Sequence, residues 1–178
     1  MQIEHIARYE GQEVTVRGWV YNRTDKGKLQ FIQLRDGSGV AQCVAFKKDM
    51  LPEEFDIAGK LTQESSVILT GTVRKDDRAP GIPGGFEIGV SDLQVVQIAA
   101  EYPITPKEHG VEFLMDNRHL WIRSKKQHAV LKIRHTVIKA VRDFFDDNGF
   151  TLADTPIFTP AACEGTTTLF EVDYFGDD

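Results

Sequence analysis

The sequence predicts a mainly β N-terminal domain that closes as a five-stranded Greek-key barrel, followed by the start of an α+β domain. Between residues 11 and 97, apolar and polar residues alternate in short runs rich in β-branched side chains, which is the period of strands. A stretch of helical composition, 51–61, interrupts the runs after the third. From residue 124 the apolar spacing changes to three and four, which is the period of a helix.

Five of these runs are predicted strands, with turn signals between them. In the turn Asp36-Gly-Ser-Gly39 we expect the glycines to supply the positive φ of a tight hairpin. Pro52 opens the helical stretch, where a missing N–H costs nothing. Three strands, a helix and two more strands fit a barrel of the OB type, which binds oligonucleotides on its second and third strands. The predicted strands are 14–21, 29–34, 40–46, 67–73 and 86–98.

The residues after the barrel predict a linker and then a long helix. Proline and glycine are frequent in 99–122, which we interpret as a linker or hinge between a domain at 1–98 and an incomplete one at 123–178. Ser124 and Gln127 form a capping-box pattern at the start of the helix, and Gly149 is placed to end it. The length of the helix suggests a partner surface, although an ordinary core-facing helix has the same periodicity.

The charge pattern argues against a general polyanion binder but permits a selective contact. The net charge is −6, whereas contacts to phosphates need clustered cations. Two groups of cations are predicted to lie in the loops between the first two and the last two strands, where OB domains contact nucleic acid. Solvated loop charges are the alternative. The groups are Arg17, Arg23, Lys26 and Lys28, and Arg74, Lys75 and Arg78.

The second and third strands carry the candidate base-binding residues. Phe31 lies in the middle of the second strand and can stack on a base, and Gln33 and Arg35 share its face because side chains alternate. Gln42, on the third strand, offers both a donor and an acceptor to a base edge. The alternative is that Phe31 belongs to the core and Gln42 is an ordinary exposed residue.

The sequence gives little support for a disulfide, a metal site, a secretory signal or a membrane span. Cys43 and Cys163 lie far apart without a CxxC pattern, so we predict reduced structural cysteines rather than a disulfide or a zinc site. His128 and His135 are too widely spaced to share a metal without further ligands. There is no secretory signal pattern and no apolar run long enough for a membrane span, which predicts an unexported, cytoplasmic protein.

These motifs together resemble the class IIb aminoacyl-tRNA synthetases over nearly the whole chain. Gly18-Trp-Val-Tyr-Asn22, the stretch 27–37 and Gln42 resemble their anticodon-binding OB domain, and 148–156 resembles motif 1 of class II enzymes. The stretches 107–110, 117–123 and 163–175 are most similar to the asparaginyl members of bacterial type.

The resemblance implies a tRNA site on the barrel. Phe31 would stack on the middle anticodon base, a uridine, and Gln42 would hydrogen-bond to it. Thr24 stands where aspartyl relatives often carry an arginine, so the phosphate contact would fall to Arg23 or Lys28. The implied partner is tRNA(Asn).

For the second part, the resemblance implies a motif 1 helix from Ser124 and a strand at 150–154, which build a homodimer interface that includes Gly149, Phe150 and Pro156. Glu164 would be the flipping-loop residue that contacts the α-ammonium of the substrate asparagine. ATP and Mg²⁺ are the implied cofactors, with their ligands in motifs 2 and 3, beyond Asp178, so we expect no catalytic residue here and no activity from these 178 residues alone. The alternatives are an aspartyl enzyme, including one that charges both tRNAs, and a free-standing OB-fold RNA-binding module.

Overall fold

The computed structural model describes residues 1–105, 107–158 and 172. The chain divides into two compact units, Met1–Asn117 and Arg118–Asp178. Because their relative placement is not determined, each unit is described by itself.

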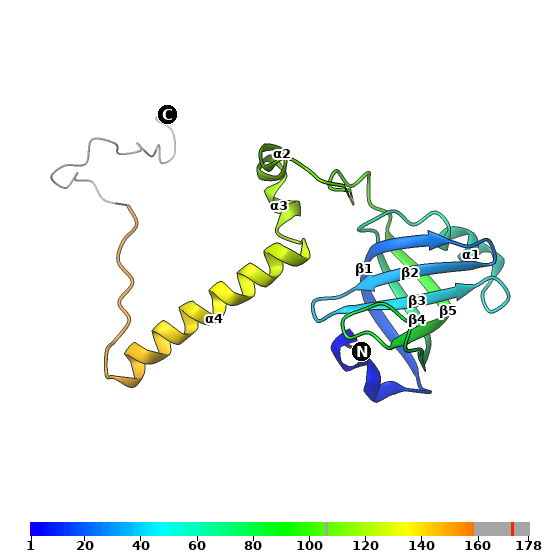
Figure 1. Cartoon of the computed structure of the whole chain (residues 1–178), viewed down its shortest axis with the longest axis horizontal. Helices are drawn as coiled ribbons and strands as arrows, with labels where there is room; N and C mark the ends of the chain where they lie inside the picture. The colour runs from blue at the N-terminus through cyan, green and yellow to red at the C-terminus, as the bar shows by residue number, and fades with distance from the viewer. Residues whose placement is uncertain (106, 159–171, 173–178) are drawn as a thin grey trace, which may run out of the picture. The chain divides into compact units, whose positions relative to one another are not determined.

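The first unit contains a closed five-stranded barrel with the strand order β1-β2-β3-β5-β4 (Figure 1). All neighbouring strands are antiparallel except β3 and β5, which are parallel. Helix α1, Pro52–Ala58, lies between β3 and β4 in the chain, as the sequence predicts. The predicted barrel is confirmed. Its strands are β1 Glu13–Asp25, β2 Leu29–Arg35, β3 Val40–Phe46, β4 Ser66–Lys75 and β5 Phe86–Gln97.

The core lies inside the barrel because the inward positions of each strand are apolar. In β2, Ile32 and Leu34 are fully buried, whereas Phe31, Gln33 and Arg35 between and beside them are partly exposed. The same alternation continues in β3, where Cys43 is buried. Period-two patterning thus fixes which side chains face outward on each strand.

An N-terminal 3₁₀ helix, η1 at Ile3–Tyr9, is present but was not predicted. Ile3 and Ile6 are fully buried and belong to the barrel core. Their spacing of three matches a 3₁₀ turn, but a segment this short gives little periodic signal.

The turn at 36–39 forms where it was predicted, by a different mechanism. Neither Gly37 nor Gly39 has a positive φ. Instead, the Asp36 carboxylate accepts hydrogen bonds from the backbone N–H groups of Ser38 and Gly39, at 2.7 and 2.8 Å. A Cβ on Gly39 would lie 2.0 Å from the backbone oxygen of Ile82, so this glycine permits close backbone packing.

The placement of both basic groups in loops was wrong for several of their members. Arg17 lies in the middle of β1, inside the strand predicted at 14–21. Because the ladders of β1 and β4 continue beyond the predicted ends, Arg23 also lies within β1, and Arg74 and Lys75 lie within β4. Lys26 and Lys28 lie in the β1–β2 loop, and Arg78 lies in the β4–β5 loop.

The segment interpreted as a linker contains two short helices, α2 at Val111–Asp116 and α3 at Arg118–Trp121. Its first residues are tied to the barrel. Ala99 donates through its backbone N–H to Ser65 Oγ (3.1 Å), and its carbonyl accepts from Thr62 Oγ1 (2.7 Å).

The second unit contains one long helix, α4 at Lys125–Asp147. Ser124 caps its start by accepting from the backbone N–H of Gln127 at 3.4 Å. Gly149 ends it with φ +82°, and Phe150 N–H bonds to the carbonyl of Phe145 (3.0 Å), which makes a Schellman motif. Both predicted helix ends are confirmed.

The strand expected at 150–154 is absent from the described residues. A strand requires a hydrogen-bonded neighbour, and no described segment pairs with these residues. The sequence pattern alone could not supply that partner.

Candidate nucleic-acid interface

The outward side chains of β2, β3 and β5 form a continuous surface, here called the outer face. It is organised as two cross-strand rows. In the first row Phe31 lies opposite Val44, which lies opposite Gly89. In the second row Gln33 lies opposite Gln42, which lies opposite Glu87. The outer face comprises Phe31, Gln33, Arg35, Gln42, Val44, Glu87 and Gly89.

Phe31 presents its ring at this surface. It is partly exposed and lies on the opposite side of β2 from the buried Ile32. Its cross-strand neighbours are Thr24 and Val44, so small or β-branched side chains flank the ring. Phe31 is not a member of the barrel core, and the alternative interpretation of it as a core residue is wrong.

Gln42 lies diagonally to Phe31, and a neighbouring strand orients its amide. Its Nε2 donates to Glu87 Oε2 at 3.0 Å. This contact uses one N–H and leaves the carbonyl oxygen and the second N–H of the amide to meet a base edge. Glu87 was not among the predicted site residues, because the parallel pairing of β3 and β5 cannot be seen in a local pattern.

Arg35 lies on the outer face in an ion pair. Its Nη2 is 2.7 Å from Oε2 of Glu64, and its guanidinium carbon is 5.8 Å from the centre of the Tyr21 ring. The side chains of Arg35 and Glu64 are only 17% and 10% exposed. Such a pair fixes the position of Arg35 and reduces the charge that it offers to a phosphate.

Arg23 is not brought to the outer face. It pairs with Ile32, which points into the barrel. Its Nε donates to the carbonyl of Leu61 at 3.1 Å, and its Nη1 donates to Oε1 of the buried Gln30 at 2.9 Å. These contacts give Arg23 a structural role at the end of the barrel.

The remaining cations differ in availability. Lys28 is exposed in the β1–β2 loop, next to the outer face. Arg78 is paired with Asp76 at 2.9 Å, and hydrogen bonds from Arg78 hold the pKa of Asp76 below its ordinary value. The structure therefore favours Lys28 over Arg23 for a phosphate contact.

Cys43 lies beneath the outer face, and its thiol is expected to be unreactive. Burial, with a smaller contribution from the negative charge of Glu87, raises its pKa to about 12. A thiol with this pKa is protonated at neutral pH and is a poor nucleophile. Cys43 is free and buried, in agreement with the expected structural cysteine, and Cys163 lies outside the described residues.

The described residues contain no group of three or more His, Cys, Asp or Glu side chains that could hold a metal ion. Within the same part of the chain, no helix is both long enough and apolar enough to cross a membrane.

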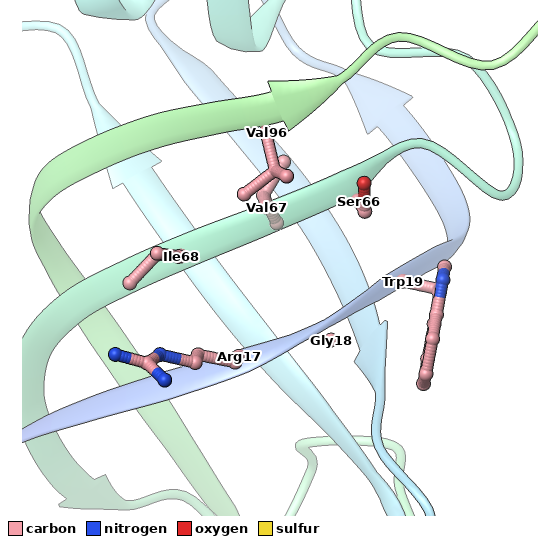
Figure 2. A pocket seen from close by; sticks show the side chains of 7 residues that line it. All are labelled: Arg17, Gly18, Trp19, Ser66, Val67, Ile68 and Val96. Atoms are coloured by element: carbon pink, nitrogen blue, oxygen red, sulfur yellow. The ribbon is translucent and has the colours of Figure 1, made fainter.

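A separate pocket of about 350 Å³ lies over the β1–β4 pair (Figure 2). Trp19 and Val96 are 42% and 63% exposed, and Arg17 is the only charged residue in the lining. The pocket offers mainly apolar contact, and its lining contains no carboxylate, histidine or cysteine. The lining residues are Arg17, Gly18, Trp19, Ser66, Val67, Ile68 and Val96.

The predicted interface residues of the second unit lie at and beyond the end of α4. Gly149 makes the left-handed turn, and Phe150 packs edge-on against Phe145 with ring centres 5.4 Å apart. Phe150 is nevertheless 63% exposed, and Pro156 is exposed. No residue of α4 is buried in this unit. Glu164 lies outside the described residues.

Two families match the chain in adjacent segments. Residues 14–96 match the family described as an OB-fold nucleic acid binding domain. Residues 110–176 match the family of class II tRNA synthetases for D, K and N.

The curated proteins that match most of this chain include asparagine-tRNA ligases. The asparagine-tRNA ligase of Koribacter versatilis is 57% identical over 98% of this chain, which covers 40% of that protein. The corresponding protein of Chloroflexus aurantiacus is 59% identical over 96% of the chain, with 38% of its own length covered.

A solved structure of asparaginyl-tRNA synthetase from Pyrococcus horikoshii, complexed with asparaginyl-adenylate, matches with a TM-score of 0.87 and 38% identity. It covers 98% of this chain and 40% of its own. The chain is thus similar over nearly its whole length to asparagine-tRNA ligases, carries segments that match the OB-fold nucleic acid binding domain and the class II tRNA synthetases for D, K and N, and spans about 40% of the length of the curated relatives it matches.

Proposed function

We propose that the complete protein is an asparagine-tRNA ligase, which activates asparagine with ATP and transfers it to tRNA(Asn), and that the barrel reads the anticodon. The observation that carries the anticodon role is the outer face. An exposed aromatic ring lies beside a glutamine amide that is already oriented by a hydrogen bond to Glu87. Stacking supplies affinity that depends little on the base, whereas the amide supplies base choice.

In this proposal, Phe31 takes the middle anticodon base on its ring. The free carbonyl and N–H of Gln42 then meet the N3–H and O4 of uridine. Cytidine presents an acceptor and a donor in the opposite order, so its binding requires the amide to rotate and give up the contact with Glu87. Gln33 borders the same site, Arg35 forms its wall, and Lys28 contacts a phosphate.

The domain organisation that we propose is an anticodon-binding domain at 1–98, a hinge at 99–122 and a catalytic domain that begins at 123. Helix α4 carries a stripe of exposed apolar side chains, including Val137 and Val141 at 56% and 52% exposure. We propose that this stripe, with Gly149, Phe150 and Pro156, packs in a homodimer. Glu164 is proposed to contact the ammonium group of asparagine.

The cofactors of the complete enzyme are proposed to be ATP and Mg²⁺. The described residues do not fit a metal site, since none of their acidic and histidine groups is arranged to hold an ion. No step of the reaction is therefore assigned to these residues. The enzyme is proposed to act in the cytoplasm.

The test is aminoacylation by the full-length protein. Purified enzyme is given ATP, Mg²⁺ and total tRNA with radiolabelled asparagine or aspartate. We expect charging with asparagine, and less charging when the middle anticodon base of tRNA(Asn) is changed from uridine to cytidine. Preferential charging with aspartate would identify an aspartyl enzyme, and no charging with either amino acid would favour an RNA-binding module.

A further inference from the structure

Arg74 occupies an unusual position at the edge of the outer face. It lies in β4 directly opposite Glu87, yet its guanidinium extends along β5 to Gly89. A Cβ on Gly89 would lie 2.7 Å from Arg74 Cζ, 2.9 Å from Nη2 and 3.1 Å from Nε. Because Cζ is the nearest atom and the two nitrogens follow at similar distances, the guanidinium lies face-on above Gly89.

Gly89 makes this position possible. It lies in the same cross-strand row as Phe31, with Val44 between them. Any side chain at position 89 would occupy the space of the guanidinium. Because Gly89 has no side chain, the guanidinium of Arg74 can lie directly against the backbone of β5.

No ion pair within 4.0 Å neutralises the charge of Arg74 in the described part of the chain, unlike those of two other arginines. Arg35 is paired with Glu64, and Arg78 is paired with Asp76. Within the described part of the chain, Arg74 forms no ion pair within 4.0 Å, although Glu87 lies directly opposite it in the ladder. Arg74 is an exposed residue, and one face of its guanidinium lies against the strand at Gly89.

The distance from Phe31 suits a second nucleotide. Two strand spacings separate β2 from β5 through β3, which is about 10 Å. Single-stranded RNA binds with its bases splayed out, stacked on aromatic rings or on arginine guanidinium planes. Two such platforms on one surface can take successive bases.

We propose that the Arg74 guanidinium, held face-on above Gly89, is a second stacking platform beside Phe31 and takes the base of a nucleotide adjacent to the one on Phe31. This inference rests on the proposed function and adds a site for a neighbouring anticodon base. It also assigns a role to Gly89 as the residue that keeps the platform in place.

The test separates a stacking platform from a simple positive charge. The chain, residues 1–178, is titrated against a fluorescein-labelled tRNA(Asn) anticodon stem-loop. Arg74→Lys keeps the charge and removes the planar group, so we expect affinity to fall about fivefold or more, the lower end of a base stack. The dependence of binding on salt should keep its slope, since the number of phosphate contacts is unchanged.

Arg8→Lys, the same exchange at an exposed residue of η1, is the control and should change affinity less than about twofold.

Gly89→Ala is the second variant in this binding experiment. The nearest atoms to its new Cβ belong to the flexible end of Arg74, so the fold should survive and only the platform should move. We expect a loss similar to that of Arg74→Lys, and no further loss when the two changes are combined. Thermal unfolding of each variant verifies the fold.

Phe31→Ala in the same assay keeps the two proposals distinguishable. If Phe31→Ala weakens binding but Arg74→Lys does not, Arg74 is not a stacking platform and the anticodon role of the barrel stands. If Arg74→Ala weakens binding and lowers the salt slope while Arg74→Lys does neither, Arg74 is a phosphate contact and the platform is overturned. If Phe31→Ala has no effect, the proposed anticodon site fails and the platform fails with it.

Discussion

The Nε2 atom of Gln42 lies 3.0 Å from Oε2 of Glu87 and donates a hydrogen bond to it across the parallel β3–β5 pair. A carboxylate accepts and never donates, so this contact fixes which end of the amide faces Glu87. The orientation of the group proposed to read a base is thus set by a residue on a different strand, 45 positions away in the sequence.

The first prediction concerns base choice at this position. Glu87→Ala frees the amide of Gln42 to rotate, so we expect the preference for uridine over cytidine to fall by about two- to tenfold, the contribution of one hydrogen bond. Binding of anticodon stem-loops with either base measures the preference. Glu53→Ala, at an exposed acid of α1, should leave it unchanged. An unchanged preference in Glu87→Ala would show that Gln42 needs no orienting partner.

The second prediction concerns the strained partner of Arg35. Glu64 has a φ of 68°, a conformation unfavourable for residues other than glycine, and it holds Arg35 through a largely buried ion pair. We expect Glu64→Ala to lower the free energy of unfolding by about 1.5 to 3 kcal/mol. Glu64→Gly loses the same ion pair but relieves the backbone, so it should be less destabilised by about 1 kcal/mol. Equal urea midpoints for the two variants would contradict the strain at position 64.

The third prediction concerns stability in acid. Burial raises the pKa of Asp36, but hydrogen bonds from the N–H of Ile3, from the hydroxyl and N–H of Ser38 and from the N–H of Gly39 outweigh it, so the pKa lies below its ordinary value of 3.8. A lowered folded pKa means that Asp36 contributes stability above its ordinary pKa and loses it as pH falls through the folded value.

The variant Asp36→Asn isolates this effect. We expect it to be less stable than the native chain by about 1 to 3 kcal/mol at pH 7, because it loses charge-assisted hydrogen bonds. The difference should begin to shrink below about pH 4, where Asp36 of the unfolded chain takes up a proton, and should be lost as pH falls through the lower pKa of the folded state. Urea unfolding at several pH values measures it, and a difference that is constant with pH would rule out the carboxylate charge as the cause.

The fourth prediction concerns the end of α4. Gly149 has a φ of +82°, so Gly149→Ala should cost about 1 to 2 kcal/mol locally and speed amide hydrogen exchange at Phe150. Gly110→Ala is the matched control, since Gly110 has a φ of −64° and a Cβ at that position would meet nothing within 4 Å. Equal effects of the two substitutions would mean that the left-handed turn does not limit the helix end.

The sequence predicted those features whose cause is local. Alternation of apolar residues predicted the barrel strands, and the positions of Ser124 and Gly149 predicted both ends of α4. It could not predict contacts that closure of the barrel creates. Glu87 reaches Gln42, and Arg74 reaches Gly89, only after distant strands pair. The strand expected at 150–154 does not form among the described residues for the same reason, because pairing with another segment decides whether a strand forms.

The most direct test of the account is a double-mutant cycle between Phe31 and the middle anticodon nucleotide. Native chain and Phe31→Ala are each titrated with the tRNA(Asn) anticodon stem-loop and with the same RNA lacking that one base. If the ring and the base stack, Phe31→Ala should weaken binding of the intact RNA by about 1 to 3 kcal/mol and have little effect on the abasic RNA. Equal losses with both RNAs, or no loss with either, would contradict the claim that the outer face reads the anticodon.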